Sequence, residues 1–266
     1  MRDSEYAAMF HAESKHWWYK NLREEVVYWI ASHLRKSPTK PEIKLPDVGC
    51  GTGGMLLCLQ QRFKNLKGVG VDYYDLPLYF AKQAASSSLI RADAKKMPFC
   101  HGVFDFITCL DVLYTREVFP AFDHVLDDMR RLLTPQGVLI LQVPAFKALY
   151  GQHDANIHGA HRFTAEEIRS GLQSAGFGRV VVYYRYNLLF SMAWIVRKIW
   201  RRKTMGSEVA TPPSLINFLL YKYFKCESGL NKRMRIPFGL SVFAVAYRSL
   251  AAVLTDDLLM ITFRLC

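Results

Sequence analysis

The sequence of 266 residues lacks the features of several special classes of protein. Its six cysteines contain no CxxC pair and no regular spacing, so neither a zinc site nor a disulfide framework is predicted. No apolar run reaches the roughly 20 residues that a membrane-spanning helix needs. The amino end lacks the charged-then-apolar pattern of a signal peptide. We therefore expect reduced thiols, a cytoplasmic location and no metal site.

Acidic residues are outnumbered: 23 Asp and Glu stand against 35 Lys and Arg, and the formal net charge is +12. This excess is compatible with an anionic membrane surface, an acidic substrate or nucleic acid. The chain contains no recognised DNA- or RNA-binding module, so nucleic acid is the weakest of these partners. Apolar residues make up 51% of the chain, which allows a full core, and the length suits one large α/β domain or a domain with an added lid.

One glycine-rich stretch, Lys44–Met55, has the pattern of a strand, a tight turn and the start of a helix. Val48 ends the apolar strand. Gly49, Gly51 and Gly53 can take positive φ, or let the atoms of a ligand come close to the backbone. At the carboxyl end of the first strand of an open α/β sheet, such a turn binds nucleotide-like ligands.

Two classes of cofactor fit this turn. Gly49, Gly51 and Gly54 satisfy the G-x-G-x-x-G pattern of dinucleotide-binding proteins, which alone is a weak signal. Asp47 favours the other class, because a carboxylate beside the turn repels a pyrophosphate and attracts an ammonium group. S-adenosylmethionine (SAM) carries an ammonium and a sulfonium and no phosphate. The turn therefore favours SAM over NAD. A third alternative, a glycine turn with no ligand, is disfavoured because several glycines cluster directly after a strand.

Later segments follow in an order that makes the chain resemble the class I SAM-dependent methyltransferases. The resemblance is to the group related to ubiquinone and menaquinone biosynthesis (methyltransferase type 11), and it covers about residues 44–180. The segments that carry it are Leu66–Asp72, Ile90–Ala94, Gly102–Asp111 and Leu132–Leu141. It implies a Rossmann-like α/β fold: a doubly wound, seven-stranded, mostly parallel sheet with an N-terminal helical cap and a helical insert before the last strand.

The resemblance also implies a SAM site along the carboxyl edge of the sheet. Asp72 would hold the ribose, and one carboxylate can accept hydrogen bonds from two neighbouring hydroxyls whatever the family. Asp93 would lie beside the adenine and Leu110 next to the methyl group. The expected cofactor-binding residues are Asp47, Gly49, Gly51, Asp72, Tyr73, Asp93, Ala94 and Leu110.

The chain divides into five parts on this interpretation. They are a helical cap (1–40), a SAM-binding core (41–186), a basic amphipathic insert (187–235), the last strand (236–247) and a tail without any resemblance (248–266). We expect the last strand to pair antiparallel with Arg179–Tyr186, and Thr164 and Glu167 to form a capping box.

Pro46 is unusual in a central strand because it lacks a backbone N–H donor, so the strand either begins late or has a locally broken ladder.

The cap and the insert each allow two interpretations. His16–Lys20 resembles a family cap over the SAM site; Trp17 and Trp18 are expected to pack the helix on the sheet, and His16 is an open candidate. In the insert, apolar residues are interleaved with basic ones, and no acid occurs from 185 to 207. A second helical run is expected at Leu215–Phe224. The insert is either a lid over a lipid-like acceptor that rests on an anionic membrane surface, or a packed hairpin with a solvated basic face.

Methyl transfer from a sulfonium is an in-line displacement, so the protein mainly positions the acceptor atom and excludes water. A base is needed only when the acceptor must lose a proton. The loop Tyr150–Thr164 resembles a histidine-containing segment of the family. Its His153, His158 and His161 are candidate bases or acceptor-positioning residues, because imidazole titrates near neutral pH. Metal binding, or hydrogen bonds to loop backbone alone, are the alternatives.

Tyr114 and Thr115 stand where the family commonly has a Glu-His pair. Tyr114 is then a candidate hydrogen-bond donor to the acceptor, or the domain has lost catalysis. We expect a SAM-dependent methyltransferase that acts on a small apolar, lipid-like or aromatic acceptor. The alternative is a catalytically degenerate SAM-binding domain that acts as a scaffold or regulatory partner.

Overall fold

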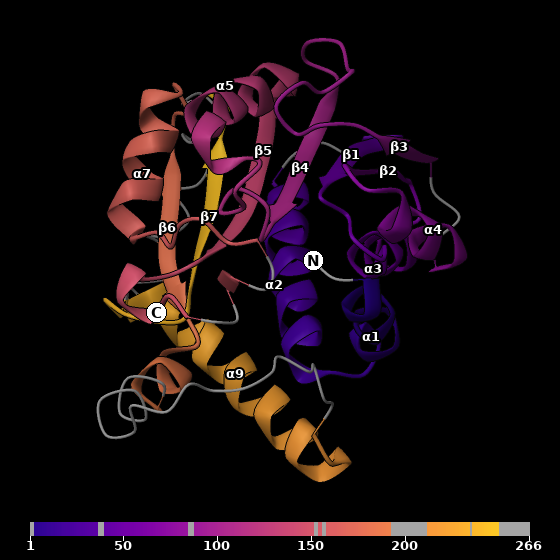
Figure 1. Ribbon diagram of the computed structural model, residues 1–266. Helices are drawn as coiled ribbons and strands as arrows, with labels where there is room; N and C mark the ends of the chain where they lie inside the picture. Colours follow the sequence, from indigo (N-terminus) through magenta and orange to yellow (C-terminus); the bar gives the residue numbers. More distant parts are fainter. Residues whose placement is uncertain are drawn as a thin grey trace.

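The structure, a computed structural model, describes residues 3–36, 40–84, 88–151, 154–155, 158–192, 212–234 and 236–249. These residues form a seven-stranded sheet in the order β3-β2-β1-β4-β5-β7-β6 (Figure 1). The strands are β1 (Ile43–Val48), β2 (Leu66–Asp72), β3 (Ser88–Arg91), β4 (Phe104–Leu110), β5 (Leu133–Pro144), β6 (Val180–Arg185) and β7 (Ser241–Tyr247). Only β7 runs antiparallel, to both β5 and β6. The predicted fold class and the antiparallel last pair are confirmed.

Helices cover both faces of the sheet, so each face buries its own apolar cluster. They are α1 (Asp3–Glu13), α2 (Trp17–Leu34), α3 (Gly54–Arg62), α4 (Asp75–Ala84), α5 (Phe122–Leu132), α7 (Ala165–Ser174) and α9 (Ser214–Met234), with 3-10 turns η1 (Phe119–Ala121) and η2 (Lys147–Leu149). Helices α2 and α3 pack on one face, and α5 and α7 on the other. The capping box of Thr164 and Glu167 is present at the start of α7, as predicted.

The ladder beside Pro46 is broken on one side. Strand β1 pairs with β2 along its whole length but with β4 only at Asp47 and Val48. The backbone N–H of Lys44 donates instead to the side chain of Asp105, at 3.0 Å. Successive residues of a strand face opposite neighbours, so the missing donor of Pro46 faces the same gap as Lys44. Of the two predicted outcomes, the locally broken ladder is the one observed.

Helix boundaries differ from the sequence prediction in two places. The sequence pattern predicts the second crossover helix at Tyr79–Ala85, but α4 begins at Asp75, because Pro77 is compatible with a first helical turn. The apolar stripe over Glu117–Leu133 predicts a single helix, whereas the chain forms η1 and then α5. Both differences concern ends of elements, and they leave the order of the strands unchanged.

The cap and the insert pack against each other through an aromatic cluster. Trp17 of α2 stacks on Phe224 of α9, with ring centroids 4.8 Å apart, and meets Tyr186 edge-on. The second run of the insert is longer than expected, since α9 extends to Met234. The first run falls mainly on residues 193–211, and the tail on 250–266, which lie outside the described residues. None of the described helices has the length and apolarity required to cross a bilayer.

Candidate functional site

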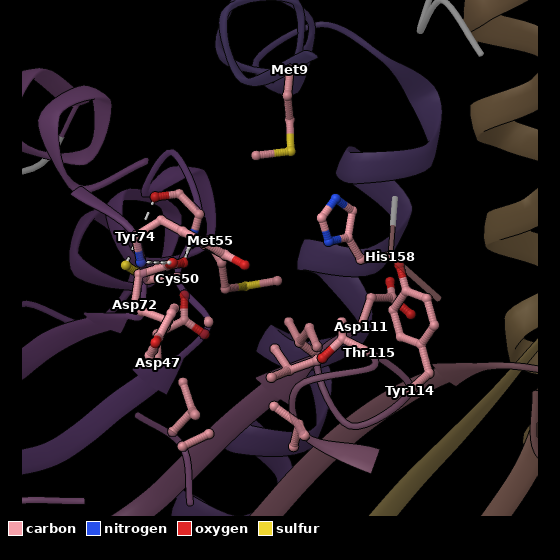
Figure 2. Close-up of a pocket in the computed structure, with 18 of the residues that line it drawn as sticks. Met9, Asp47, Cys50, Met55, Asp72, Tyr74, Asp111, Tyr114, Thr115 and His158 are labelled. Carbon is pink, nitrogen blue, oxygen red and sulfur yellow. Dashed lines mark hydrogen bonds between the residues drawn. The ribbon is translucent and has the colours of Figure 1, made fainter. Parts of the chain in front are cut away.

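A cavity of about 1020 Å³ lies between helices α1 and α2 and the carboxyl ends of β1, β2 and β4. All the residues expected to bind the cofactor line it: Asp47, Gly49, Gly51, Asp72, Tyr73, Asp93, Ala94 and Leu110. Figure 2 shows two groups of side chains across this space. Asp47, Asp72 and Met55 lie on one side, and Tyr114, Thr115 and His158 on the other.

The glycine turn leaves no room for side chains at its closest point. Gly49, Gly51 and Gly53 all have positive φ, at 70°, 53° and 85°. A Cβ on Gly49 would lie 2.2 Å from a methyl carbon of Val112. The turn therefore needs glycine both for its backbone conformation and for its contact with the loop after β4.

Asp47 is a buried carboxylate that forms no ion pair with any of the described residues. Its Oδ1 accepts a hydrogen bond of 2.6 Å from the hydroxyl of Thr108. Burial, with smaller contributions from the carboxylates of Glu13 and Asp72, raises the pKa of Asp47 from its ordinary value near 3.8 to about 7. A buried carboxylate in this state is stabilised by a bound cation.

Glu13 occupies the amino end of α3. Its Oε2 accepts a hydrogen bond of 2.6 Å from the hydroxyl of Thr52, and its carboxylate also accepts one from the backbone of Gly54. A Cβ on Gly54 would lie 2.3 Å from this oxygen, so the contact requires glycine. The amino end of this helix is where dinucleotide-binding folds hold a pyrophosphate. Here a carboxylate already fills that position, which disfavours a dinucleotide.

Asp72 and Asp93 are held by backbone donors at the edge of the cavity. The two oxygens of Asp72 accept hydrogen bonds from the N–H groups of Gly51 and Tyr74, at 3.0 and 3.1 Å. Burial raises the pKa of Asp72. Asp93 accepts a hydrogen bond of 2.9 Å from the backbone of Lys95 and pairs with its ammonium at 3.3 Å. Tyr73 is half exposed at the rim.

The candidate catalytic residues are not all in the same place. Tyr114 and His158 line the cavity. His158 lies 3.2 Å from a carboxylate oxygen of Glu117 and has a positive φ of 61°. His161 is not among the lining residues: its ring stacks on Phe119, with centroids 4.4 Å apart. His153 lies outside the described residues, in which no cluster of three metal-ligating side chains occurs.

The lining residues that were not among the expected site residues include Glu13, Tyr19, Arg23 and Asp111. Tyr19 and Arg23 are four residues apart on α2, so helical periodicity places them on one face. Asp111 follows β4 directly, and its position at a strand end is a usable signal. Glu13 has no such signal, because its contact spans about 40 residues of sequence. His16, the open candidate, lines the cavity and caps α2 by accepting from the N–H of Trp18.

Comparison with known proteins identifies the domain. Residues 46–141 match the family described as "Methyltransferase domain". A malonyl-[acyl-carrier protein] O-methyltransferase of Geobacter sulfurreducens is 27% identical over 184 residues, 62% of this chain and 66% of that protein. A demethylmenaquinone methyltransferase of Bacillus cereus is 29% identical over 119 residues, 42% of this chain and 49% of that protein. The matches thus span about half to two thirds of these relatives' lengths.

Solved methyltransferase structures have the same fold. Phosphoethanolamine N-methyltransferase 2 of Haemonchus contortus, in complex with SAM, superposes with a TM-score of 0.60 and 17% identity. This match covers 93% of the present chain and 57% of the other. The sheet order and the turn at the end of β1 define the class I, Rossmann-like methyltransferase fold. Residues 46–141 therefore match a methyltransferase domain, and the sheet that contains them has the class I methyltransferase fold.

Proposed function

We propose that the chain transfers a methyl group from SAM to a small apolar, lipid-like or aromatic acceptor. The observation that carries the choice of donor is a set of carboxylates along the wall of the cavity. Glu13, Asp47, Asp72 and Asp111 all line the cavity, and burial raises the pKa of each one. Such a site is stabilised by a cationic ligand. The sulfonium of SAM supplies an activated methyl group when it is bound.

The residues around the turn divide the donor's binding among them. Asp47 and Glu13 provide negative charge for an ammonium group, and Asp72 provides two acceptor oxygens for ribose hydroxyls. Asp93 lies at the adenine side. Arg23 lines the cavity from α2 and is available for the carboxylate of the amino-acid tail.

The apolar part of the cavity lining supports an apolar or aromatic acceptor. Trp18, Tyr19 and Tyr114 line it together with Leu22 and Leu240. Trp18 stacks on a buried neighbour, with ring centroids 4.0 Å apart, so its own position is restrained. Fixed aromatic faces bind apolar rings and chains at low entropic cost. The Bacillus cereus relative is named for a quinone-type acceptor, which is consistent with this proposal.

A scaffold without catalysis is the second candidate, and Tyr114-Thr115 is the observation that favours it. The family commonly has a Glu-His pair at this place. Binding of SAM is expected under both proposals, whereas S-adenosylhomocysteine is formed only by an enzyme. Incubation with labelled SAM and a lipid and phenolic extract, followed by mass spectrometry for added methyl groups, separates the two.

Replacing Asp72 by asparagine is expected to weaken SAM binding about 10- to 100-fold, because a charged acceptor for two hydroxyls is lost. Isothermal titration calorimetry measures this change. Asp75→Asn is the matched control: Asp75 is an exposed residue near the same strand end, pairs with Arg91 and does not line the cavity. Binding of NAD in place of SAM by the unmodified protein would contradict the proposed donor.

We propose further that α9 brings the cavity to an anionic membrane surface. Its exposed apolar side chains are Leu215, Ile216, Phe218, Leu219, Tyr223, Leu230 and Met234. The single acid of the helix, Glu227, is buried and accepts from the N–H groups of Asn187 and Leu188. The outer side of α9 is therefore apolar and basic, a combination that matches anionic lipid.

The double substitution Leu215→Glu/Leu219→Glu is expected to reduce binding to vesicles of phosphatidylcholine with 30% phosphatidylglycerol about 10-fold or more. Sedimentation at low salt measures the bound fraction. Tyr79→Glu is the control, since Tyr79 is an equally exposed apolar side chain on α4. Equal binding of all three proteins, or none by the unmodified protein, would exclude this surface.

A further inference from the structure

Asp111, directly after β4, has a backbone conformation that is rare for a residue with a side chain. Its φ is +55°, in the left-handed region. A hydrogen bond of 2.8 Å from its N–H to the carbonyl oxygen of Gln142 on β5 holds it there. Residues kept in such conformations are concentrated at functional sites, where the surrounding structure compensates for their cost.

The side chain of Asp111 is oriented by two buried residues. Arg185 of β6 donates to Oε1 of Gln142 at 2.8 Å, and Nε2 of Gln142 donates to Oδ2 of Asp111 at 3.0 Å. A guanidinium can only donate, so Gln142 must turn its oxygen to Arg185 and its NH₂ group to Asp111. Arg185 is itself 2% exposed and lies over the rings of Tyr186 and Phe243. The amide of Gln142 therefore cannot flip, and Asp111 always faces its NH₂ group.

The other carboxylate oxygen of Asp111 is available to a ligand. Asp111 lines the cavity and lies with Tyr114, Thr115 and His158, across from the glycine turn (Figure 2). Within the described part of the chain, Oδ1 has no recorded hydrogen-bond donor. Burial raises the pKa of Asp111 to about 6, against the hydrogen bond from Gln142 and the charges of two arginines. The titratable and charged groups that face it are Arg185, Arg162, Tyr19, Tyr114, Tyr186 and Cys109.

We propose that Asp111 accepts the proton of the attacking atom, and that the acceptor is an apolar molecule with a hydroxyl or amine at that atom. This inference rests on the proposed methyl transfer. The acceptor's lone pair forms the new bond to the methyl carbon while the methyl–sulfur bond breaks and its electron pair stays on sulfur. The proton moves to Oδ1 of Asp111 and then to solvent. Gln142 and Arg185 are positioning residues.

The proposal separates two kinds of acceptor. A hydroxyl or amine donates a hydrogen bond to Asp111 before it reacts. A carboxylate has no proton to give, and the charge of Asp111 repels it. The missing Glu-His pair is then no sign of lost catalysis, because the carboxylate is supplied from the residue directly after β4.

Asp111→Asn gives a sharp test because the donor on Gln142 cannot reverse. The new amide must turn its oxygen to Gln142, so its NH₂ group faces the cavity. The site then offers a donor in place of an acceptor. Asparagine tolerates the left-handed region, so the backbone is retained. Asp111→Gly, which also fits this region, is the second variant.

The test uses protein loaded with S-adenosylhomocysteine and two probes, 4-octylphenol and its methyl ether, 4-octylanisole. Calorimetry is expected to show that the unmodified protein prefers the phenol about 10-fold or more, since a charged acceptor meets its hydroxyl. This preference should disappear in Asp111→Asn and Asp111→Gly. It should persist in Asp105→Asn, a control on the same strand whose carboxylate pairs with Lys40 outside the cavity.

The positioning role has its own readout. The phenol preference should be lost on acidification with a midpoint near pH 6, where Asp111 becomes protonated. Gln142→Met removes the donor but keeps the backbone clamp, so the midpoint should move to higher pH. A merely structural Gln142 would leave it unchanged.

Several results would overturn the assignment. They are equal affinity for the two probes, a preference that survives in both Asp111 variants, or no binding of either probe. A loss of S-adenosylhomocysteine binding in the Asp111 variants would assign Asp111 to the cofactor instead. If the unmodified protein fails to bind S-adenosylhomocysteine at all, the proposed function itself is contradicted.

Discussion

Replacing Asp47 by asparagine is expected to abolish useful SAM binding and, in the same protein, to stabilise the ligand-free fold at neutral pH. Loss of a buried charge that pairs with a ligand cation costs about 2–5 kcal/mol, so the Kd should rise by about 30-fold to several-thousand-fold. The second effect follows because Asp47 is buried with the hydroxyl of Thr108 as its partner and two other carboxylates nearby. Asparagine removes the uncompensated charge.

The stability effect has a defined pH window. The pKa of Asp47 is near 3.8 in an ordinary environment and about 7 in the folded protein. Between these values the folded state binds more protons than the unfolded state, so this group's contribution to stability falls as pH rises. Below pH 4 the variant and the unmodified protein should match. Above pH 7 the variant should be more stable by up to about 4 kcal/mol, because the pKa is raised by roughly three units and each unit corresponds to about 1.4 kcal/mol.

Thermal unfolding from pH 4.5 to 8 measures the difference, and calorimetry with SAM measures binding. Asp105→Asn is the opposite case, because Asp105 is also buried but accepts from the backbone of Lys44 and pairs with Lys40. It should lose stability and keep its affinity for SAM. A Tm for Asp47→Asn below that of the unmodified protein at pH 8 would show that Asp47 is held for the fold instead of for a cation.

Local patterns were sufficient to predict the framework of this site. The strand before the turn, the glycines with positive φ and the acid at the end of β2 are encoded within a few residues each. Burial is nearly continuous along β4, the second half of β5 and β7, and the sequence displays this as apolar runs, as expected for strands covered on both faces. Even the broken ladder at Pro46 follows from the covalent structure of proline.

The rest depends on contacts between distant segments. Glu13 reaches the turn because α1 packs against α4, where Phe10 contacts Phe80, and nothing near Glu13 in the sequence indicates this. The conformation of Asp111 depends on Gln142 and Arg185, which come from two other strands. Such networks arise from tertiary packing, so a pattern search finds their members only one at a time.

The electrostatic design separates binding from stability. Asp47 has no cationic partner among the described residues and can therefore bind a cationic ligand. Other buried acids form ion pairs that stabilise the fold. Glu25, for example, is buried between α2 and α9 and pairs with Lys232 at 2.8 Å. The hydroxyl of Tyr183 also donates to it. An acid in a cavity with a raised pKa is thus a more specific mark of the ligand site than an acid in a salt bridge.

Trp17→Ala is expected to destabilise the protein by about 3–5 kcal/mol, the usual cost of truncating a large buried aromatic residue. Trp17 is 7% exposed, and its ring joins the cap to α9 by stacking on Phe224. The backbone N–H of Trp17, which the variant keeps, donates to Oδ1 of Asn217 on α9 at 2.9 Å, so the expected loss comes from the ring. Removing the ring leaves a void between α2, α9 and the end of β6. The void persists because these three elements cannot all shift inward to fill it.

Trp18→Ala is the matched comparison, because Trp18 is the next residue but lines the cavity and is only partly buried. It should cost less stability, about 1–2 kcal/mol, and should weaken binding of apolar probes such as 4-octylphenol. Urea unfolding followed by circular dichroism measures both variants. If Trp17→Ala destabilises the protein no more than Trp18→Ala does, the stacking of Trp17 on Phe224 does not hold α2 to α9. Other contacts would then have to hold these two helices together.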